Sequence, residues 1–247
     1  MAESHRVALV TGSARRVGAV IARRLHAAGY DLVVHHRDSS GEASKLCAEL
    51  ERERPGSTLV LQADLAQFDR LPELVAQAIG RFGRLDALVN NASAFYPTPI
   101  GSITPAQWDD LFAANARAPF FLAQAAAPHL VANAGAIVNL VDIYADSALR
   151  NHAVYVMAKA ALVAMTRALA LDLAPHVRVN AVAPGAVLWP EQGKSEQAKQ
   201  AILSSVPLAR MGSPEEVAEA VRWLLLDARY TTGQVVRVDG GRSLAAG

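Results

Sequence analysis

Short apolar runs alternate with longer amphipathic segments along the whole chain. The runs are three to six residues long and rich in β-branched residues, which is typical of buried strands. We expect seven strands, at residues 7–10, 31–34, 58–61, 87–89, 136–141, 177–182 and 234–238. Segments with a helical repeat lie between them, at residues 16–28, 41–54, 71–82, 153–173 and 217–226.

One further helix is expected between residues 104 and 130. Thr104 and Gln107 have the spacing of a capping box, with Pro105 at the first helical position. The helix should run through Asn115 and bend at Pro119.

The regular alternation predicts βαβ units, and therefore a parallel sheet covered by helices on both faces. No linker or change in composition divides the chain. We therefore expect one α/β domain of the doubly wound Rossmann type, spanning residues 1–247, with a seven-stranded parallel sheet.

The amino-acid composition limits the kinds of protein that this chain can be. Of 247 residues, 52% are hydrophobic and 19% are charged, as in a compact enzyme. The formal net charge of +1 gives no broad basic surface, so we expect neither nucleic acid nor membrane partners. Cys47 is the single cysteine, which excludes an internal disulfide, and the N-terminus has no apolar signal region. We expect a cytoplasmic protein.

Tyr155 and Lys159 form a candidate acid–base pair. They lie four residues apart on the helix expected at 153–173, so they share one face. A nearby ammonium group favours the phenolate and lowers a phenol pKa that starts near ~10, so Tyr155 can exchange a proton near neutral pH. Asp142 follows a strand, where ligands bind in open α/β sheets, and should face the same cleft. The alternative is a solvated helix face.

Glycines mark the first strand-to-helix turn. The segment from Thr11 to Gly18 joins the first strand to the first helix, although the gap of six residues from Gly12 to Gly18 exceeds the usual spacing. Glycine in such a turn lets backbone N–H groups approach a pyrophosphate at the helix N-terminus. The turn predicts a dinucleotide site.

The order and spacing of these motifs resemble the short-chain dehydrogenase/reductase family from end to end. The matching positions are Thr11, Gly12, Gly18, Asp64, Asn90, Asn91, Ala92, Asn115, Tyr155, Lys159, Asn180, Pro184, Gly185 and residues 239–241. The resemblance implies that Lys159 bonds the nicotinamide ribose, that Asn115 holds a water linking Lys159 to solvent, and that Asn91 steadies the backbone. The other implied cofactor contacts are Gly12, Arg16, Val17, Asp64, Leu65, Ala92, Tyr155, Pro184 and Gly185.

Three departures from the family pattern resemble its pteridine reductase branch. Arg16 replaces a glycine of the first turn, Ser93 replaces the glycine after Asn-Asn-Ala, and Asp142 replaces the usual serine. This branch implies that Arg16 lies by the pyrophosphate and reaches the substrate. It also implies that Ser93 bonds the pterin, that Phe95 stacks on it opposite the nicotinamide, and that Asp142 and Tyr155 deliver the proton.

Physical chemistry favours the same substrate. A pterin is a flat heteroaromatic whose recognition needs an aromatic face and a few polar groups at its edge. A carboxylate beside a ketone would repel the developing oxyanion, so Asp142 suits a substrate that is protonated on nitrogen. The competing interpretations are a core aromatic for Phe95 and a turn cap for Asp142.

The end of the second strand indicates the cofactor. His36, Arg37 and Ser39 can bind the extra phosphate of NADP, for which Arg37 offers charge-assisted bonds. The negative charge of Asp38 disfavours a phosphate at this position. The alternative interpretation is that these polar residues form a solvated cluster on the surface and bind no cofactor. No metal site is expected.

Residues 186–204 are polar and poorly patterned, and members of the family use this segment as a substrate lid. Leu188, Trp189 and Pro190 are the candidates for substrate contact. Trp189 could instead pack the lid onto the domain.

Three functions compete. The first is an NADPH-dependent pteridine reductase taking a dihydropterin or dihydrofolate to the tetrahydro form, and the second is a carbonyl reductase acting on ketones or quinones. The third is a non-catalytic NADP-binding protein, against which Asn115, Tyr155 and Lys159 argue. By analogy with the family, we expect a homotetramer assembled through the helices at 108–130 and 153–173.

Overall fold

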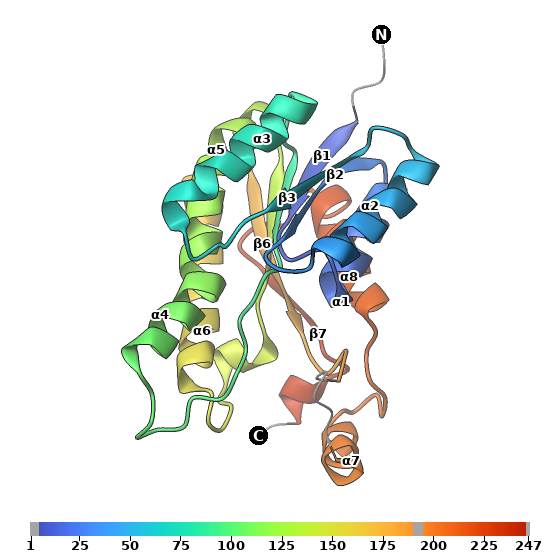
Figure 1. Cartoon of the computed structure of the whole chain (residues 1–247). Coiled ribbons are helices and arrows are strands. Elements are labelled where there is room, and N and C mark those ends of the chain that lie inside the picture. The colour runs from blue at the N-terminus through green and yellow to red at the C-terminus, as the bar shows by residue number, and fades with distance from the viewer. Residues whose placement is uncertain (1–4, 190–194, 246–247) are drawn as a thin grey trace.

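The computed structural model describes residues 5–189 and 195–245, and its core is one parallel sheet (Figure 1). All seven expected strands are present and every neighbouring pair is parallel. The order across the sheet is β3-β2-β1-β4-β5-β6-β7. The strands are β1 (Arg6–Val10), β2 (Tyr30–His36), β3 (Thr58–Gln62), β4 (Ala87–Asn90), β5 (Ala136–Leu140), β6 (Arg178–Pro184) and β7 (Val235–Val238).

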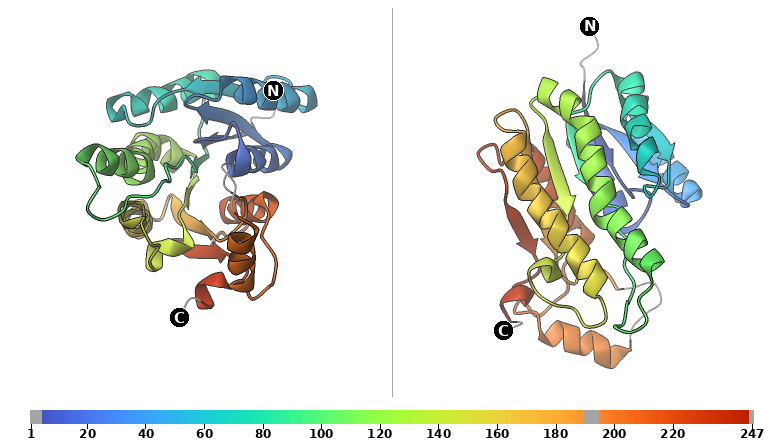
Figure 2. Two further views of the ribbon diagram at one scale, coloured as in Figure 1. Left: turned by 60° about the horizontal axis from the view of Figure 1, so that its bottom comes forward. Right: turned by 90° about the vertical axis from the view of Figure 1, so that its left-hand side faces the viewer.

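Helices cover both faces of the sheet (Figure 2). One face carries α1 (Arg16–Ala27), α2 (Ser40–Glu53) and α8 (Pro214–Leu226). The other carries α3 (Leu71–Phe82), α5 (Ala118–Ala132) and α6 (Ala153–Asp172), and α4 (Pro105–Phe112) extends that layer. Three short turns, η1 (Phe68–Arg70), η3 (Ile143–Asp146) and η4 (Arg242–Leu244), and the helix α7 (Glu196–Ser204), within the segment expected to form a lid, lie between or after these elements.

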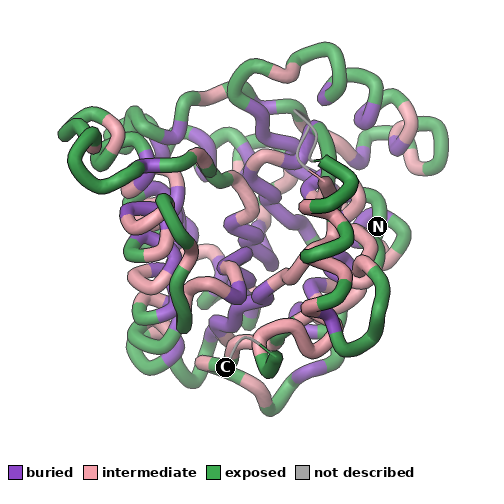
Figure 3. The backbone as a smooth tube through the Cα atoms, turned by 90° about the horizontal axis from the view of Figure 1, so that it is seen from below, coloured by how far each residue is buried: buried purple, intermediate pink, exposed green. Residues whose placement is uncertain are grey.

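Alternate strand residues supply the two cores. Along β1, Val7 and Leu9 pack with α3 and α5, whereas Ala8 and Val10 pack with α1 and α8. Both faces are therefore buried, and the buried strands run through the centre of Figure 3. In the sheet, β1 lies between β2 and β4. The order of the strands along the chain reverses at this point, because β2 and β3 lie on one side of β1 and β4 to β7 on the other. A ligand crevice is therefore expected at the carboxyl ends of these central strands.

A chain of buried polar side chains crosses the sheet from β4 to α6. Asn90 and Asn139 are paired in the ladder, and the Asn90 amide donates to Asn139 Oδ1 at 2.8 Å. Asn139 in turn donates to Thr166 Oγ1 at 2.9 Å, and the Thr166 hydroxyl donates to the Leu162 carbonyl at 2.8 Å. All three side chains are buried, so each bond replaces one with water.

The helix expected at 104–130 differs from the prediction. Its capping box is present, with Gln107 N–H donating to Thr104 Oγ1 at 3.3 Å and Thr104 N–H donating to Gln107 Oε1 at 2.9 Å. A π-helical turn, η2 (Ala113–Arg117), interrupts the helix before Pro119. Pro119, where the bend was expected, follows this turn directly as the second residue of α5.

The lid segment also differs, because α7 gives residues 196–204 a regular helix that the sequence pattern did not indicate. Ser195 caps it by accepting a hydrogen bond from Ala198 N–H at 3.2 Å.

Among the described helices, α6 has the length and composition that a membrane span requires. Eight of its 20 residues are buried against the rest of the protein, Lys159 among them. We therefore describe α6 as a core helix.

Candidate active site

A buried histidine supports the glycine turn between β1 and α1. Gly12, at φ 61°, donates its N–H to His35 Nδ1 at 3.1 Å, and His35 Nε2–H donates to the Ala63 carbonyl at 3.1 Å. The ring is neutral with its proton on Nε2, and burial lowers its pKa to about 4. His35 thus joins the turn to the end of β3. The sequence did not single out His35, because its partner Gly12 lies 23 positions away.

Asn91 holds the same turn from the other side. Its amide donates to the Thr11 carbonyl at 2.8 Å and to the Gly12 carbonyl at 3.0 Å, so it steadies this backbone as expected. A Cβ atom at Gly18 would lie 2.3 Å from the Gly12 carbonyl oxygen, so only glycine allows this approach. The turn directs the start of α1 toward an adjoining cavity.

The cavity has a volume of about 610 Å³ and brings together most of the predicted cofactor contacts. Its lining includes Gly12, Arg16, Val17, His36, Arg37, Ser39, Asp64, Leu65, Asn91 and Ala92. Four predicted cofactor contacts do not line it: Pro184 and Gly185 at the end of β6, and Tyr155 and Lys159 on α6. Tyr96 and Asp110 line it unpredicted, joined by a 2.8 Å hydrogen bond.

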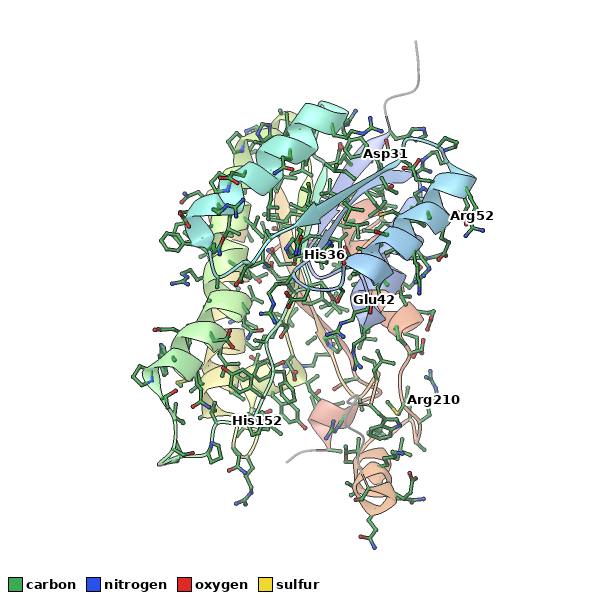
Figure 4. The ribbon with its side chains drawn as sticks, viewed as in Figure 1. Asp31, His36, Glu42, Arg52, His152 and Arg210 are labelled. Atoms are coloured by element: carbon green, nitrogen blue, oxygen red, sulfur yellow. The ribbon has the colours of Figure 1, made fainter. Side chains whose placement is uncertain are left out.

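These residues fit a dinucleotide. His36, labelled at the end of β2 in Figure 4, is buried, lines the cavity and leaves Nδ1 without a hydrogen-bond partner. A ligand hydroxyl or phosphate would satisfy that atom. Arg37 pairs with Asp38 at 2.8 Å, and both side chains are exposed. Within residues 5–189 and 195–245, no cluster of histidine, cysteine and acidic side chains is arranged to hold a metal ion.

Asp142 and Tyr155 meet as predicted. The Tyr155 hydroxyl donates to Asp142 Oδ2 at 2.7 Å, and Asp142 Oδ1 accepts the Tyr144 N–H at 2.9 Å. Asp142 therefore caps η3, which confirms the capping interpretation, and it faces Tyr155 at the same time. Lys159 is buried on the same helix, and its ammonium donates to the Leu140 carbonyl at 2.8 Å.

The expected effect of Lys159 on Tyr155 is wrong for this structure. The pKa of Tyr155 is raised, chiefly by burial and also by the Asp142 carboxylate that accepts its proton. Burial also lowers the pKa of Lys159, to about 8, and its ammonium is directed to Leu140. Tyr155 is accordingly a protonated phenol near neutral pH.

Ser93 and Asn115 are bonded to each other. The Ser93 hydroxyl donates to Asn115 Oδ1 at 2.6 Å. The Asn115 amide donates to the Ala94 and Leu111 carbonyls, both at 2.9 Å, from within the π-helical turn. Ser93 lines the cavity, whereas Asn115 is buried behind it. Asn115 thereby fixes the loop that leads to Phe95.

Phe95 is 52% exposed, which excludes the core-aromatic interpretation. One ring face stacks on His152, with centroids 4.7 Å apart and planes at 15°. Tyr155 lies edge-on to Phe95 at 4.8 Å and 80°. His152, which the sequence did not single out, is labelled beside the start of α6 in Figure 4.

The lid contacts the glycine turn. Arg16, at φ 54°, donates from Nη2 to the Trp189 carbonyl at 3.2 Å. The Trp189 ring lies 5.9 Å from the ammonium of Lys199 on α7, which favours packing within the lid. Leu188 is 37% exposed, and Pro190 lies outside the described residues.

His35 is expected to make stability depend on pH. Its folded pKa of about 4 lies below the ordinary 6.5, so the unfolded chain binds the proton first as pH falls. The stabilisation is complete above pH ~6.5 and is lost on acidification toward pH ~4, by roughly 3 kcal/mol. Urea unfolding at pH 7.0 and 4.5 should show that loss, and His35→Gln should reduce it. An equal loss in the variant would contradict the assignment, and replacement of the exposed His176 by Gln is the control.

Comparison with known proteins defines the class. The family model described as "Enoyl-(Acyl carrier protein) reductase" matches residues 12–243. Pteridine reductase 1 of Leishmania tarentolae is 38% identical over 96% of each chain. The 3-oxoacyl-[acyl-carrier-protein] reductase FabG of Staphylococcus aureus is 33% identical over 95% of this chain and 96% of its own. The granaticin polyketide synthase putative ketoacyl reductase 2 of Streptomyces violaceoruber is 37% identical over 96% of each.

The chain belongs to the short-chain dehydrogenase/reductase family, as its motifs predicted. It is therefore an oxidoreductase of a family that uses nicotinamide cofactors and acts on small molecules. Its similarity to a pteridine reductase and to two ketoacyl reductases leaves the choice of substrate to the site itself.

Proposed function

We propose that the protein is an NADPH-dependent pteridine reductase that converts a dihydropterin or dihydrofolate to the tetrahydro form. The observation that carries the proposal is the carboxylate of Asp142 at 2.7 Å from the Tyr155 hydroxyl. A carboxylate at this position disfavours a developing alkoxide and suits a substrate that gains a proton on nitrogen.

The chain's own groups account for the proton. The reduced nicotinamide supplies hydride to carbon when it is bound. Tyr155, kept protonated by burial and by Asp142, can donate its proton to the substrate nitrogen. A water at Arg16, which lines the cavity, is the second possible donor. Lys159 would bond the nicotinamide ribose, and Asn115 would hold a water connecting it to solvent.

Phe95 supports a flat substrate. His152 stacks on one face of its ring and Tyr155 lies at 80° to it, yet half of the Phe95 side chain stays exposed and could stack on a heteroaromatic ring. Ser93 lines the adjoining cavity and would bond the edge of the pterin. Leu188 and Trp189 would close over the substrate from a lid at about residues 186–204.

His36, Arg37 and Ser39 support NADP rather than NAD as the cofactor. All three line the cavity. Arg37 would exchange its exposed bond with Asp38 for a bidentate bond to the extra phosphate. Asp64 and Leu65 line the same cavity and would contact the adenine.

The proposal extends to the assembly and its place in the cell. Trp108, Phe120 and Met157 expose large apolar side chains on α4, α5 and α6, the layer through which a homotetramer would form. The single cysteine suits the cytoplasm.

A carbonyl reductase is the second candidate, because FabG and the granaticin enzyme are named for ketoacyl reduction. Tyr155 and Lys159 serve either function. The two candidates differ in what they require of Asp142.

The deciding experiment measures cofactor oxidation with NADPH and NADH in parallel. Dihydrobiopterin, dihydromonapterin, dihydrofolate and a ketone panel are the substrates. We expect NADPH-dependent turnover of at least one pterin or folate, and about a 100-fold loss of it in Asp142→Ser because the variant no longer holds Tyr155. Absence of pterin and folate turnover, or higher ketone activity in Asp142→Ser than in wild type, would support the carbonyl reductase instead.

A further inference from the structure

The guanidinium of Arg242 bonds two segments of the site that are far apart in the sequence. Its Nη2 donates to the Tyr144 hydroxyl at 2.9 Å, and its carbon lies 5.6 Å from the centroid of that ring. Its Nε donates to Ser205 Oγ at 3.2 Å. Tyr144 belongs to η3, two residues after Asp142, and Ser205 directly follows α7. Arg242 therefore joins the turn that carries the acid to the end of the lid.

Tyr144 determines how the Asp142 carboxylate is turned. Asp142 Oδ1 accepts the Tyr144 N–H at 2.9 Å, which leaves Oδ2 directed at the Tyr155 hydroxyl, 2.7 Å away. A displacement of Tyr144 would rotate the carboxylate and lengthen the bond to Tyr155. The Arg242 contacts limit that displacement, because they engage both the hydroxyl and the ring face of Tyr144.

Arg242 is itself held in place. Asp239 accepts the N–H of Gly241 at 3.0 Å with one carboxylate oxygen and the N–H of Ser243 at 2.8 Å with the other. These bonds form the turn that begins η4, and η4 lies beside α7 in Figures 1 and 2. Arg242 therefore belongs to a turn whose backbone is held by hydrogen bonds to Asp239.

We propose that Arg242 is a positioning residue that orients the Asp142 carboxylate through Tyr144 and couples that orientation to the lid through Ser205. This inference rests on the role of Asp142 in the proposed function. It assigns the C-terminal turn a part in catalysis, because the acid is aligned only while the end of the lid and η4 are docked together.

A neighbouring ion pair provides the matched control. Arg237 on β7 donates to Asp146 Oδ2 at 2.7 Å, which ties the same part of the chain to the far end of η3. Both side chains are nearly half exposed, and the bond between them involves neither Tyr144 nor Ser205. A merely structural tie between β7 and η3 would be weakened equally by Arg237→Met and by Arg242→Met.

The experiment compares Arg242→Met, Tyr144→Phe, the double variant and Arg237→Met. We expect kcat to fall about tenfold in each of the first two, because misdirected catalytic groups lose rate steeply with distance. The double variant should lose no more than either single variant, since both changes break one connection. The acid limb of the pH profile of kcat should shift in the same variants. NADPH affinity should stay within about twofold, and Arg237→Met should retain wild-type kcat.

Three outcomes would overturn the inference: wild-type kcat and pH profile in Arg242→Met, an equal loss in Arg237→Met, or a double variant about 100-fold below wild type. The assay uses whichever substrate the wild-type enzyme reduces. Failure of wild type to reduce any pterin or folate therefore refutes the proposed function, whereas only the comparison among variants refutes the role of Arg242.

Hydrogen exchange gives a readout that needs no substrate. In Arg242→Met, the Tyr144 amide and the amides of residues 203–206 should exchange faster, because one side chain protects both segments. In Arg237→Met, both should exchange as in wild type. Unchanged exchange at Tyr144 in a folded Arg242→Met protein would refute the coupling.

Discussion

Tyr155→Phe is expected to lower kcat for the preferred substrate by about 10³-fold. The change removes the hydroxyl that donates to Asp142 Oδ2 at 2.7 Å and leaves the ring in its contact with Phe95. Substrate stacking should survive, so KM should change only a few-fold and the loss should fall on the chemical step. Steady-state and single-turnover oxidation of NADPH would separate the two parameters.

Tyr230→Phe is the control for that change, because this hydroxyl is fully exposed and its loss should leave kcat unaltered. Adding Asp142→Asn to Tyr155→Phe should cost little further rate, since the two groups act as one donor. A Tyr155→Phe enzyme within about fivefold of wild-type kcat would assign proton delivery to another group, with a water at Arg16 as the next candidate.

Gly18→Ala is expected to lower the free energy of unfolding by about 2–4 kcal/mol and to weaken NADPH binding by at least about 100-fold. The added Cβ would lie 2.3 Å from the Gly12 carbonyl oxygen, 2.5 Å from the Asn91 amide nitrogen and 2.9 Å from Ser13 Cα. Two of these atoms are backbone, so the turn itself must move. Urea unfolding and fluorescence titration with NADPH measure the two effects.

Gly80→Ala is the matched control, because a Cβ atom there would meet nothing within 4 Å. Gly80 lies inside α3, where alanine is the better helix former, so the variant should gain about 0.5–1 kcal/mol. NADPH affinity should be unchanged. If Gly18→Ala retained both stability and affinity, the close approach of α1 to the glycine turn would not be needed for the dinucleotide site.

The sheet was predictable because its signals are local. Each strand is a short β-branched run, and the parallel arrangement follows from the helix between each pair. The π-helical turn was not predictable, since the Asn115 side chain that accompanies it bonds the carbonyl of Ala94, 21 residues earlier. The sequence analysis expected a bend at Pro119 because proline is the local signal for one, whereas the irregular turn lies just before it, at Ala113–Arg117.

The structure brings Asp142 and Tyr155 together as expected and gathers most of the predicted cofactor contacts around one cavity, but the expected electrostatic effect of Lys159 on Tyr155 is wrong. Spacing on a helix shows that Tyr155 and Lys159 share a face, but not where the ammonium is directed. The Lys159 ammonium donates a hydrogen bond to the Leu140 carbonyl, and burial together with the Asp142 carboxylate raises the pKa of Tyr155. His35 and Arg242 were missed for a related reason, because their partners Gly12 and Tyr144 lie 23 and 98 positions away. Only the packed sheet brings such pairs together.

The buried bonds among Asn90, Asn139 and Thr166 have a consequence for the rim of the sheet. A buried amide without a hydrogen-bond partner is costly. A shift of β5 by one residue along β4 would leave the side chains of Asn90 and Asn139 without their partners, so these bonds disfavour any other register. Ser93 follows β4, Asp142 follows β5 and Tyr155 lies on α6, so these two bonds fix how far each reactive group stands from the others. The distances among the reacting groups therefore depend on hydrogen bonds in the buried centre of the sheet, away from the site itself.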